Sequence, residues 1–119
     1  MNAQVTYEDF EGGASKVAWA PFNGLAYEGP IANPAKDAVN GSDNVGKFSN
    51  DGVGDFCFGL GTLTATADLS VFNLMKIKIW SPVAPTNALL KFEGPNGNVE
   101  KFIDITVANA WVEYSVDLS

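Results

Sequence analysis

The chain has 119 residues, 46% of them hydrophobic and 12% aromatic, and it carries a net charge of −7 without a single histidine. This length and composition predict one globular domain spanning residues 1–119. The acidic charge argues against nucleic acid and anionic membrane surfaces as partners, and no apolar run is long enough for membrane insertion. The lack of histidine excludes a Ser-His-Asp or Cys-His nucleophile, and the lone Cys57 excludes an intrachain disulfide.

Short stretches of alternating apolar and polar residues predict β-strands along most of the chain. The predicted strands are Val5–Phe10, Lys16–Ala20, Leu25–Glu28, Val45–Phe48, Phe56–Leu63, Leu74–Trp80, Ala88–Glu93, Val99–Val107 and Trp111–Leu118. Turn signals such as Gly94–Gly97 separate them, and Asn33–Ala38 predicts one helical turn with Pro34 near its start. The pattern indicates an all-β fold, specifically an antiparallel β-sandwich of the jelly-roll type.

The apolar positions of these strands predict the core. Its expected members are Phe10, Phe58, Leu60, Ile77, Ile79, Leu90, Phe92, Ile103, Ile105, Tyr114 and Val116. The first predicted strand, Val5–Phe10, and the segment Val112–Leu118 are expected at or near sheet edges. An edge strand that lacks a partner is a site where another chain can pair.

A tryptophan in line with two lysines marks the polar face of the strand Leu74–Trp80. An aromatic ring on a wet sheet face offers a surface on which a sugar ring stacks, while lysines bind hydroxyls. Lys91 and Glu93 alternate with apolar residues on the next strand and are expected to share this face. The residues predicted to bind carbohydrate are Trp80, Trp19, Lys76, Lys78, Lys91 and Glu93. The alternative for both tryptophans is a structural role at the rim of the core.

Acidic residues in two turns offer oxygen ligands of the kind that Ca²⁺ prefers. Glu8 and Glu11 lie near the N-terminus, and Asp51 and Asp55 flank a glycine-rich turn. These four residues are the candidate ligands of a structural calcium ion. The alternative is that they are solvated turn carboxylates without a metal.

Several segments in sequence order resemble β-sandwich carbohydrate-binding modules of the type appended to laminarinase-like bacterial glycoside hydrolases. These segments are Tyr7–Glu11, Asn33–Pro34 with Asn40–Lys47, Asp68–Phe72, Lys76–Pro82, Leu89–Glu93, Thr106–Trp111 and Tyr114–Ser119. The resemblance implies non-catalytic binding of a polysaccharide, most typically a β-glucan such as laminarin, outside the cell or at its surface. It also implies a structural role for Trp111 and a calcium ion near the opening strand.

The chain departs from these modules at its C-terminal end, because they continue into a further strand that pairs near the opening one. The sequence therefore predicts a sandwich that lacks its closing strand. This departure favours an alternative function, a structural subunit of an extracellular or virion assembly such as a decoration or fibre protein. In that case other copies of the chain are the partners, whereas a carbohydrate-binding module belongs to a larger multidomain protein.

Catalysis is not expected. Hydrolysis of a glycoside requires two carboxylates on opposite sides of a cleft, roughly 5–9.5 Å apart. No pair of acidic residues in the sequence is marked by a motif that indicates such a role. We therefore expect a binding or structural protein and not an enzyme.

Overall fold

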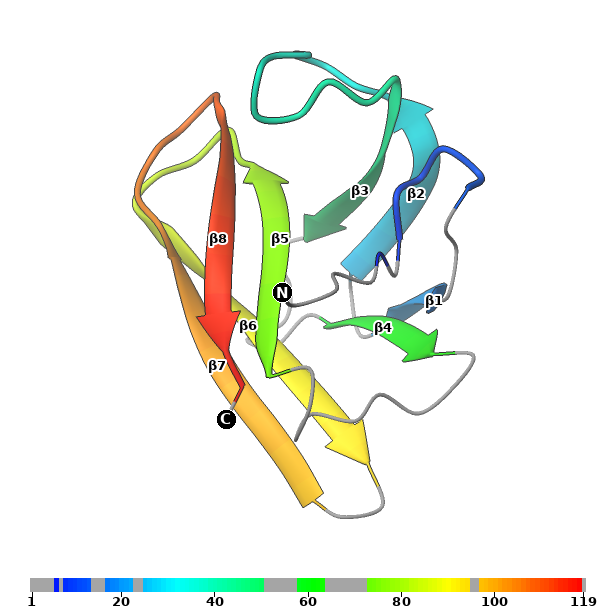
Figure 1. Ribbon diagram of the computed structural model, residues 1–119, viewed down its shortest axis with the longest axis vertical. Coiled ribbons are helices and arrows are strands. Elements are labelled where there is room, and N and C mark those ends of the chain that lie inside the picture. The colour runs from blue at the N-terminus through cyan, green and yellow to red at the C-terminus, as the bar shows by residue number, and fades with distance from the viewer. Residues whose placement is uncertain are drawn as a thin grey trace, which may run out of the picture. The chain divides into compact units, whose positions relative to one another are not determined.

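The computed structural model describes residue 6 and residues 8–13, 17–22, 25–50, 58–63, 73–94 and 97–118 of the chain. Within these ranges the regular structure consists of antiparallel β-strands, and no described residue is helical, which confirms the all-β prediction (Figure 1). The strands are β1 (Val17–Phe22), β2 (Leu25–Ala32), β3 (Asn44–Asn50), β4 (Phe58–Leu63), β5 (Leu74–Trp80), β6 (Thr86–Gly94), β7 (Gly97–Ile105) and β8 (Trp111–Asp117).

The strands belong to two compact units. One unit contains β1–β4, and the other contains β5–β8 together with the loop Ala35–Gly41. The described residues of each unit form two antiparallel ladders of two strands. Since the described residues form strands and loops only, they include no apolar helix long enough to cross a membrane. The single domain expected over residues 1–119 stays a prediction.

In the first unit β1 pairs with β4, β2 pairs with β3, and β2 also lies against β1 and β4. The β2–β3 ladder is interrupted between Glu28 and Ile31, where Pro30 lacks the amide hydrogen that a ladder position donates. Before the interruption Tyr27 lies opposite Phe48, with ring centroids 5.1 Å apart. Aromatic pairs at this separation stabilise a ladder through ring contacts.

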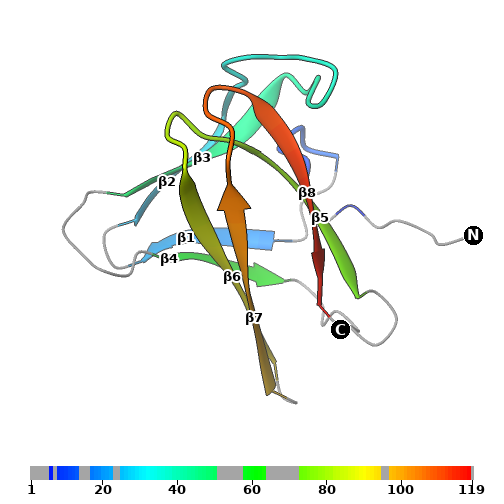
Figure 2. The same ribbon diagram turned by 90° about the vertical axis from the view of Figure 1, so that its left-hand side faces the viewer.

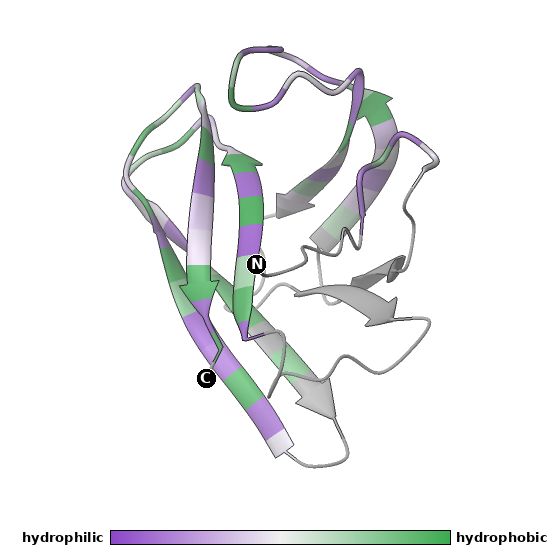
Figure 3. Ribbon diagram, in the orientation of Figure 1, coloured by the Kyte–Doolittle hydropathy of each residue, from purple (hydrophilic) through white to green (hydrophobic). Residues whose placement is uncertain are grey.

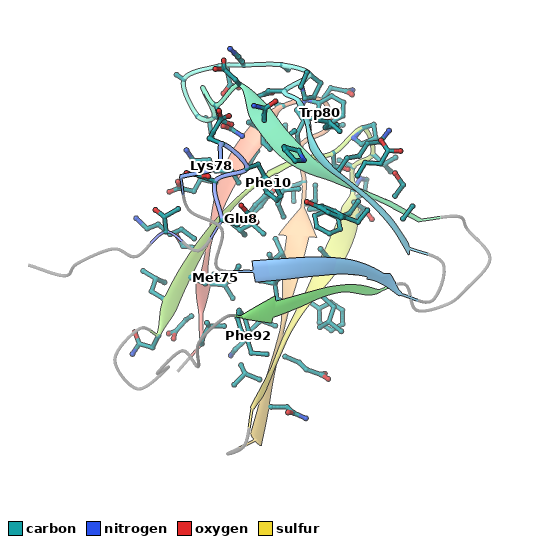
Figure 4. All side chains as sticks on the ribbon, turned by 90° about the vertical axis from the view of Figure 1, so that its right-hand side faces the viewer. Glu8, Phe10, Met75, Lys78, Trp80 and Phe92 are labelled. Carbon is teal, nitrogen blue, oxygen red and sulfur yellow. The ribbon has the colours of Figure 1, made fainter. Side chains whose placement is uncertain are left out.

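The end of the predicted strand Val5–Phe10 differs from the prediction, while Val5 and Tyr7 lie outside the described residues. Glu8 forms a single bridge, and Phe10 lies in a bend with a φ of 56°. The Glu8 side chain accepts a hydrogen bond from the Phe10 amide, at 3.1 Å, which turns the chain instead of extending it (Figure 4). The prediction of an extended strand through Phe10 is therefore wrong, because local side-chain to backbone bonding competes with a ladder.

In the second unit β5 pairs with β8 along its whole length, and β6 pairs with β7. Hydrogen bonds continue the β5–β8 ladder at both ends, from the Asn109 amide to the Ser81 carbonyl and from the Leu118 amide to the Asn73 carbonyl, each at 2.7 Å. The β6–β7 hairpin closes where Gly94 lies opposite Gly97, as the turn signal predicts (Figure 2). Gly97 has a φ of +124°, a conformation that side chains other than glycine rarely adopt.

The core of this unit is formed by apolar side chains from all four of its strands. Ile103, Ile105, Val116 and Leu118 are its buried centre, and Ile103 is only 4% exposed. Figure 3 shows the alternation of hydrophobic and hydrophilic residues along β5. Its apolar residues Met75, Ile77 and Ile79 pack against this centre. The partly buried residues that pack against the centre are Met75, Ile77, Ile79, Ala88, Leu90, Phe92, Val99 and Tyr114.

Most of the predicted core is therefore confirmed, and Leu118 and Val45 are buried residues outside the predicted list. Phe10 is half-buried in the first unit. The side chains of Phe58 and Leu60 lie outside the described part of the structure.

The predicted helical turn over Asn33–Ala38 is wrong, since these residues form an irregular loop with bends. Asp37 explains the difference. Its carboxylate oxygen Oδ1 accepts hydrogen bonds from the amides of Val39 and Asn40, both at 2.8 Å, and its own amide donates to the Asn40 carbonyl. An aspartate that binds the amides two and three residues ahead stabilises a turn in place of a helix.

Candidate functional site

A row of polar side chains lies on the outer face of the β5–β8 ladder. Lys76 lies opposite Ser115, and Lys78 lies opposite Glu113; all four are exposed. Because the residues between them pack into the core, strand alternation directs these side chains away from it. We call Lys76, Lys78, Glu113 and Ser115 the polar row. It offers ammonium donors, a hydroxyl and a carboxylate acceptor on one face.

Trp80 lies at the end of the polar row, opposite Trp111. Trp111 is only 8% exposed, in line with the structural role that the resemblance implies. Trp80 is half-buried, and its indole Nε1 is buried without a hydrogen-bond partner among the described residues. A sugar stacked on Trp80 would therefore contact only part of the indole ring, and its binding role stays a prediction.

The other three predicted carbohydrate contacts lie apart from the polar row in the strand order. Trp19 is on β1, opposite Gly61, in the first unit. Lys91 and Glu93 are on β6, which pairs with β7 and not with β5. The side chains of these residues lie outside the described part, so the expected common face stays a prediction for them.

Two of the four candidate calcium ligands are described, and both accept hydrogen bonds from backbone amides. Glu8 binds the Phe10 amide, and Glu11 Oε1 accepts a hydrogen bond from the Asn44 amide at 2.5 Å. Among the described residues no three acidic, histidine or cysteine side chains gather closely enough to hold a metal ion. Asp51 and Asp55 lie outside the described residues, so the calcium site stays a prediction.

Glu8 also influences the phenol of Tyr27. Burial raises the pKa of Tyr27 above its usual value of 10.0, and the negative charge of Glu8 raises this pKa further. Both effects disfavour the phenolate, since it would be poorly hydrated and would lie near another anion. The Glu8 carboxylate therefore takes part in the local electrostatics of the first unit whether or not it also binds a metal.

A groove lies between β7 and β8, which are neighbours without hydrogen bonds between their described residues. Its volume is about 300 Å³, at the lower end of the range of roughly 300–1,000 Å³ found for ligand pockets. Residues 101–104 of β7 and 114–117 of β8 line the groove. Strand alternation places Phe102, Asp104, Ser115 and Asp117 on the face opposite the core, whereas Ile103, Tyr114 and Val116 pack in the core.

The groove and its most exposed aromatic residue, Phe102, were not predicted from the sequence. Phe102 is 68% exposed, more than any other large hydrophobic side chain in the described part of the chain. The alternation of β7 nevertheless indicates that Phe102 is exposed. Ile103 and Ile105 were assigned to the core, and a residue next to a core position on a strand points to the opposite face.

Comparisons of the chain with protein-family models, with curated proteins and with solved structures found no match. The resemblance to carbohydrate-binding modules is carried by short segments of the sequence alone. Within the described part of the chain, the polar row and the β7–β8 groove both expose hydrogen-bonding side chains to solvent.

Proposed function

We propose that the chain is a non-catalytic carbohydrate-binding module, built as an antiparallel β-sandwich of the jelly-roll type. The observation that supports this most is the register of β5 and β8, which aligns Lys76 with Ser115 and Lys78 with Glu113 on an exposed face. Lysine donates hydrogen bonds, glutamate accepts them, and serine does both. Sugar hydroxyls are donors and acceptors at once, so such a row matches their chemistry.

The proposed ligand is a β-glucan such as laminarin, in accordance with the resemblance of the sequence. Trp80 and Trp19 provide the stacking surfaces, and Lys91 and Glu93 bind further hydroxyls. The affinity is modest, since each exposed polar contact contributes little after the cost of ordering both partners. The proposed location is outside the cell or on its surface, with a structural calcium ion held by Glu8, Glu11, Asp51 and Asp55.

The experiment that tests this function is isothermal titration calorimetry of the chain against a panel of soluble polysaccharides that includes laminarin. We expect saturable binding to at least one β-glucan. Trp80→Ala and Trp19→Ala then report whether either indole contributes. Absence of binding to every glycan in the panel would remove the proposal.

A second candidate function is that of a structural subunit in an extracellular or virion assembly. One observation favours it: each described strand has hydrogen bonds to a single described neighbour, so each has one edge without a partner in the described residues. Edges of this kind can pair with strands of another copy. Light scattering after size-exclusion chromatography separates the two functions, because a regular large assembly supports the structural one and a discrete monomer supports the binding module.

A further inference from the structure

We infer that the groove between β7 and β8 is a binding subsite for a neutral pyranose of a glycan chain, with Phe102 as its stacking surface. This inference rests on the proposed carbohydrate-binding function and gives it a location outside the residues predicted from the sequence. The first support is the exposure of Phe102, since most of its ring is accessible to solvent. An open aromatic ring is the feature that the half-buried Trp80 only partly provides.

The polar groups around Phe102 provide the second support. Asp104, Ser115 and Asp117 are exposed, and all three line the groove. Carboxylates accept hydrogen bonds from sugar hydroxyls, and the serine hydroxyl both donates and accepts. An aromatic ring beside several donors and acceptors is the combination that recognises a sugar, because one pyranose face is apolar while its rim is polar.

The third support is the continuity of the groove with the polar row. Ser115 belongs to both, since it lies opposite Lys76 in the β5–β8 ladder and also lines the groove. A glycan with one pyranose on Phe102 could therefore continue over β8 toward Lys76 and Lys78. The small volume of the groove suits a short stretch of such a chain.

The charge of the groove selects the class of glycan. Two aspartates and one lysine line it, which leaves an excess of negative charge on a chain that is already acidic. Like charges at close range disfavour binding. The ligand is therefore a neutral glycan, and polymers of uronic acids are excluded from this subsite.

The test uses calorimetry of the full chain with soluble laminarin and, separately, with alginate, a uronic acid polymer. The variants are Phe102→Ala, Phe102→Tyr and Val83→Ala, where Val83 is a matched control because it is 60% exposed and does not line the groove. Truncation of residues this exposed leaves the fold intact, which far-UV circular dichroism verifies. We expect Phe102→Ala to weaken laminarin binding at least about fivefold, and Phe102→Tyr and Val83→Ala to bind like the unchanged chain.

The outcomes separate the two proposals. If the unchanged chain binds laminarin and Phe102→Ala binds it equally well, the groove is not the subsite, although the carbohydrate-binding function stands. If the unchanged chain binds alginate more tightly than laminarin, the assignment of a neutral ligand is overturned. If it binds no glycan at all, the proposed function itself fails and the subsite fails with it.

Discussion

Lys76 and Ser115 are register partners in the β5–β8 ladder, and Ser115 also lines the groove that Phe102 borders. One residue thus connects a row of exposed polar side chains with a mixed aromatic and polar groove. Both features arise from the same alternation that directs Met75, Ile77 and Val116 into the core on the opposite face. The packing of the core therefore fixes which side chains are available to a ligand.

The polar row predicts that Lys78 contributes to glycan binding. Replacement by Met keeps the aliphatic stem and removes the donor, and we expect the affinity for laminarin to fall roughly two- to tenfold, as for one lost hydrogen bond of about 0.5–1.5 kcal/mol. Lys47→Met is the matched control, since Lys47 is also exposed but lies on β3 in the first unit. Equal loss of affinity in both variants would point to a general charge effect instead of a contact.

The close approach of Phe10 to Gly46 makes a prediction about stability. A β-carbon at Gly46 would lie 2.5 Å from the nearest atom of the Phe10 ring. We therefore expect Gly46→Ala to lower the free energy of unfolding by about 1–3 kcal/mol, as overpacking does, measured by urea denaturation.

The control for this contact is Gly41→Ala. A β-carbon there would meet the Asp37 carbonyl oxygen at 3.6 Å, an ordinary contact. This variant should leave the free energy of unfolding unchanged or raise it by up to about 1 kcal/mol. A Gly46→Ala variant as stable as Gly41→Ala would show that the Phe10 ring does not rest on Gly46.

Tyr114 carries a buried hydroxyl without a hydrogen-bond partner among the described residues. Its removal in Tyr114→Phe relieves an unsatisfied polar group, so the free energy of unfolding should stay the same or rise by up to about 1 kcal/mol. Ile103→Ala, which opens a cavity at the centre of the same core, should instead cost about 2–5 kcal/mol. A loss of more than about 1 kcal/mol in Tyr114→Phe would reveal a partner for the hydroxyl.

The raised pKa of Tyr27 predicts a loss of stability in alkali. The folded state retains the phenol proton at a pH where the unfolded chain has lost it. The contribution of the protonated phenol to the free energy of unfolding is therefore complete below pH 10.0, and it is lost as the pH rises through the pKa of Tyr27 in the folded state. Above pH 10 the unchanged chain should therefore lose stability more steeply than Tyr27→Phe. Parallel stability curves for the two proteins, measured by urea denaturation from pH 8 to 11, would contradict this.

The sequence predicted strands and core positions best where apolar and polar residues alternate along a strand. Strand β5 spans the predicted residues, and the apolar positions of β7 and β8 were assigned correctly because a one-residue shift would expose the core. The pairing of β5 with β8 could not be predicted, since it joins residues far apart in the chain. The loop at Asp37 was missed because one side-chain oxygen, bound to two amides, decided between a helix and a turn.

The candidate site was predicted less completely than the core. Lys76 and Lys78 are exposed, as their alternation indicated, but their partners Ser115 and Glu113 depend on the strand pairing. Phe102 was overlooked because an aromatic residue in an apolar segment is usually buried. Only its position next to Ile103 shows that it points away from the core.

The central claim is that the outer face of β8, with its neighbours on β5 and β7, binds a neutral glycan. Amide chemical-shift mapping of the ¹⁵N-labelled chain during titration with soluble laminarin tests it most directly, because it reports both binding and location. The account predicts saturable shifts that are largest at Lys76, Lys78, Phe102 and Ser115. No shifts at a large excess of laminarin, or shifts confined to β1–β4, would contradict it.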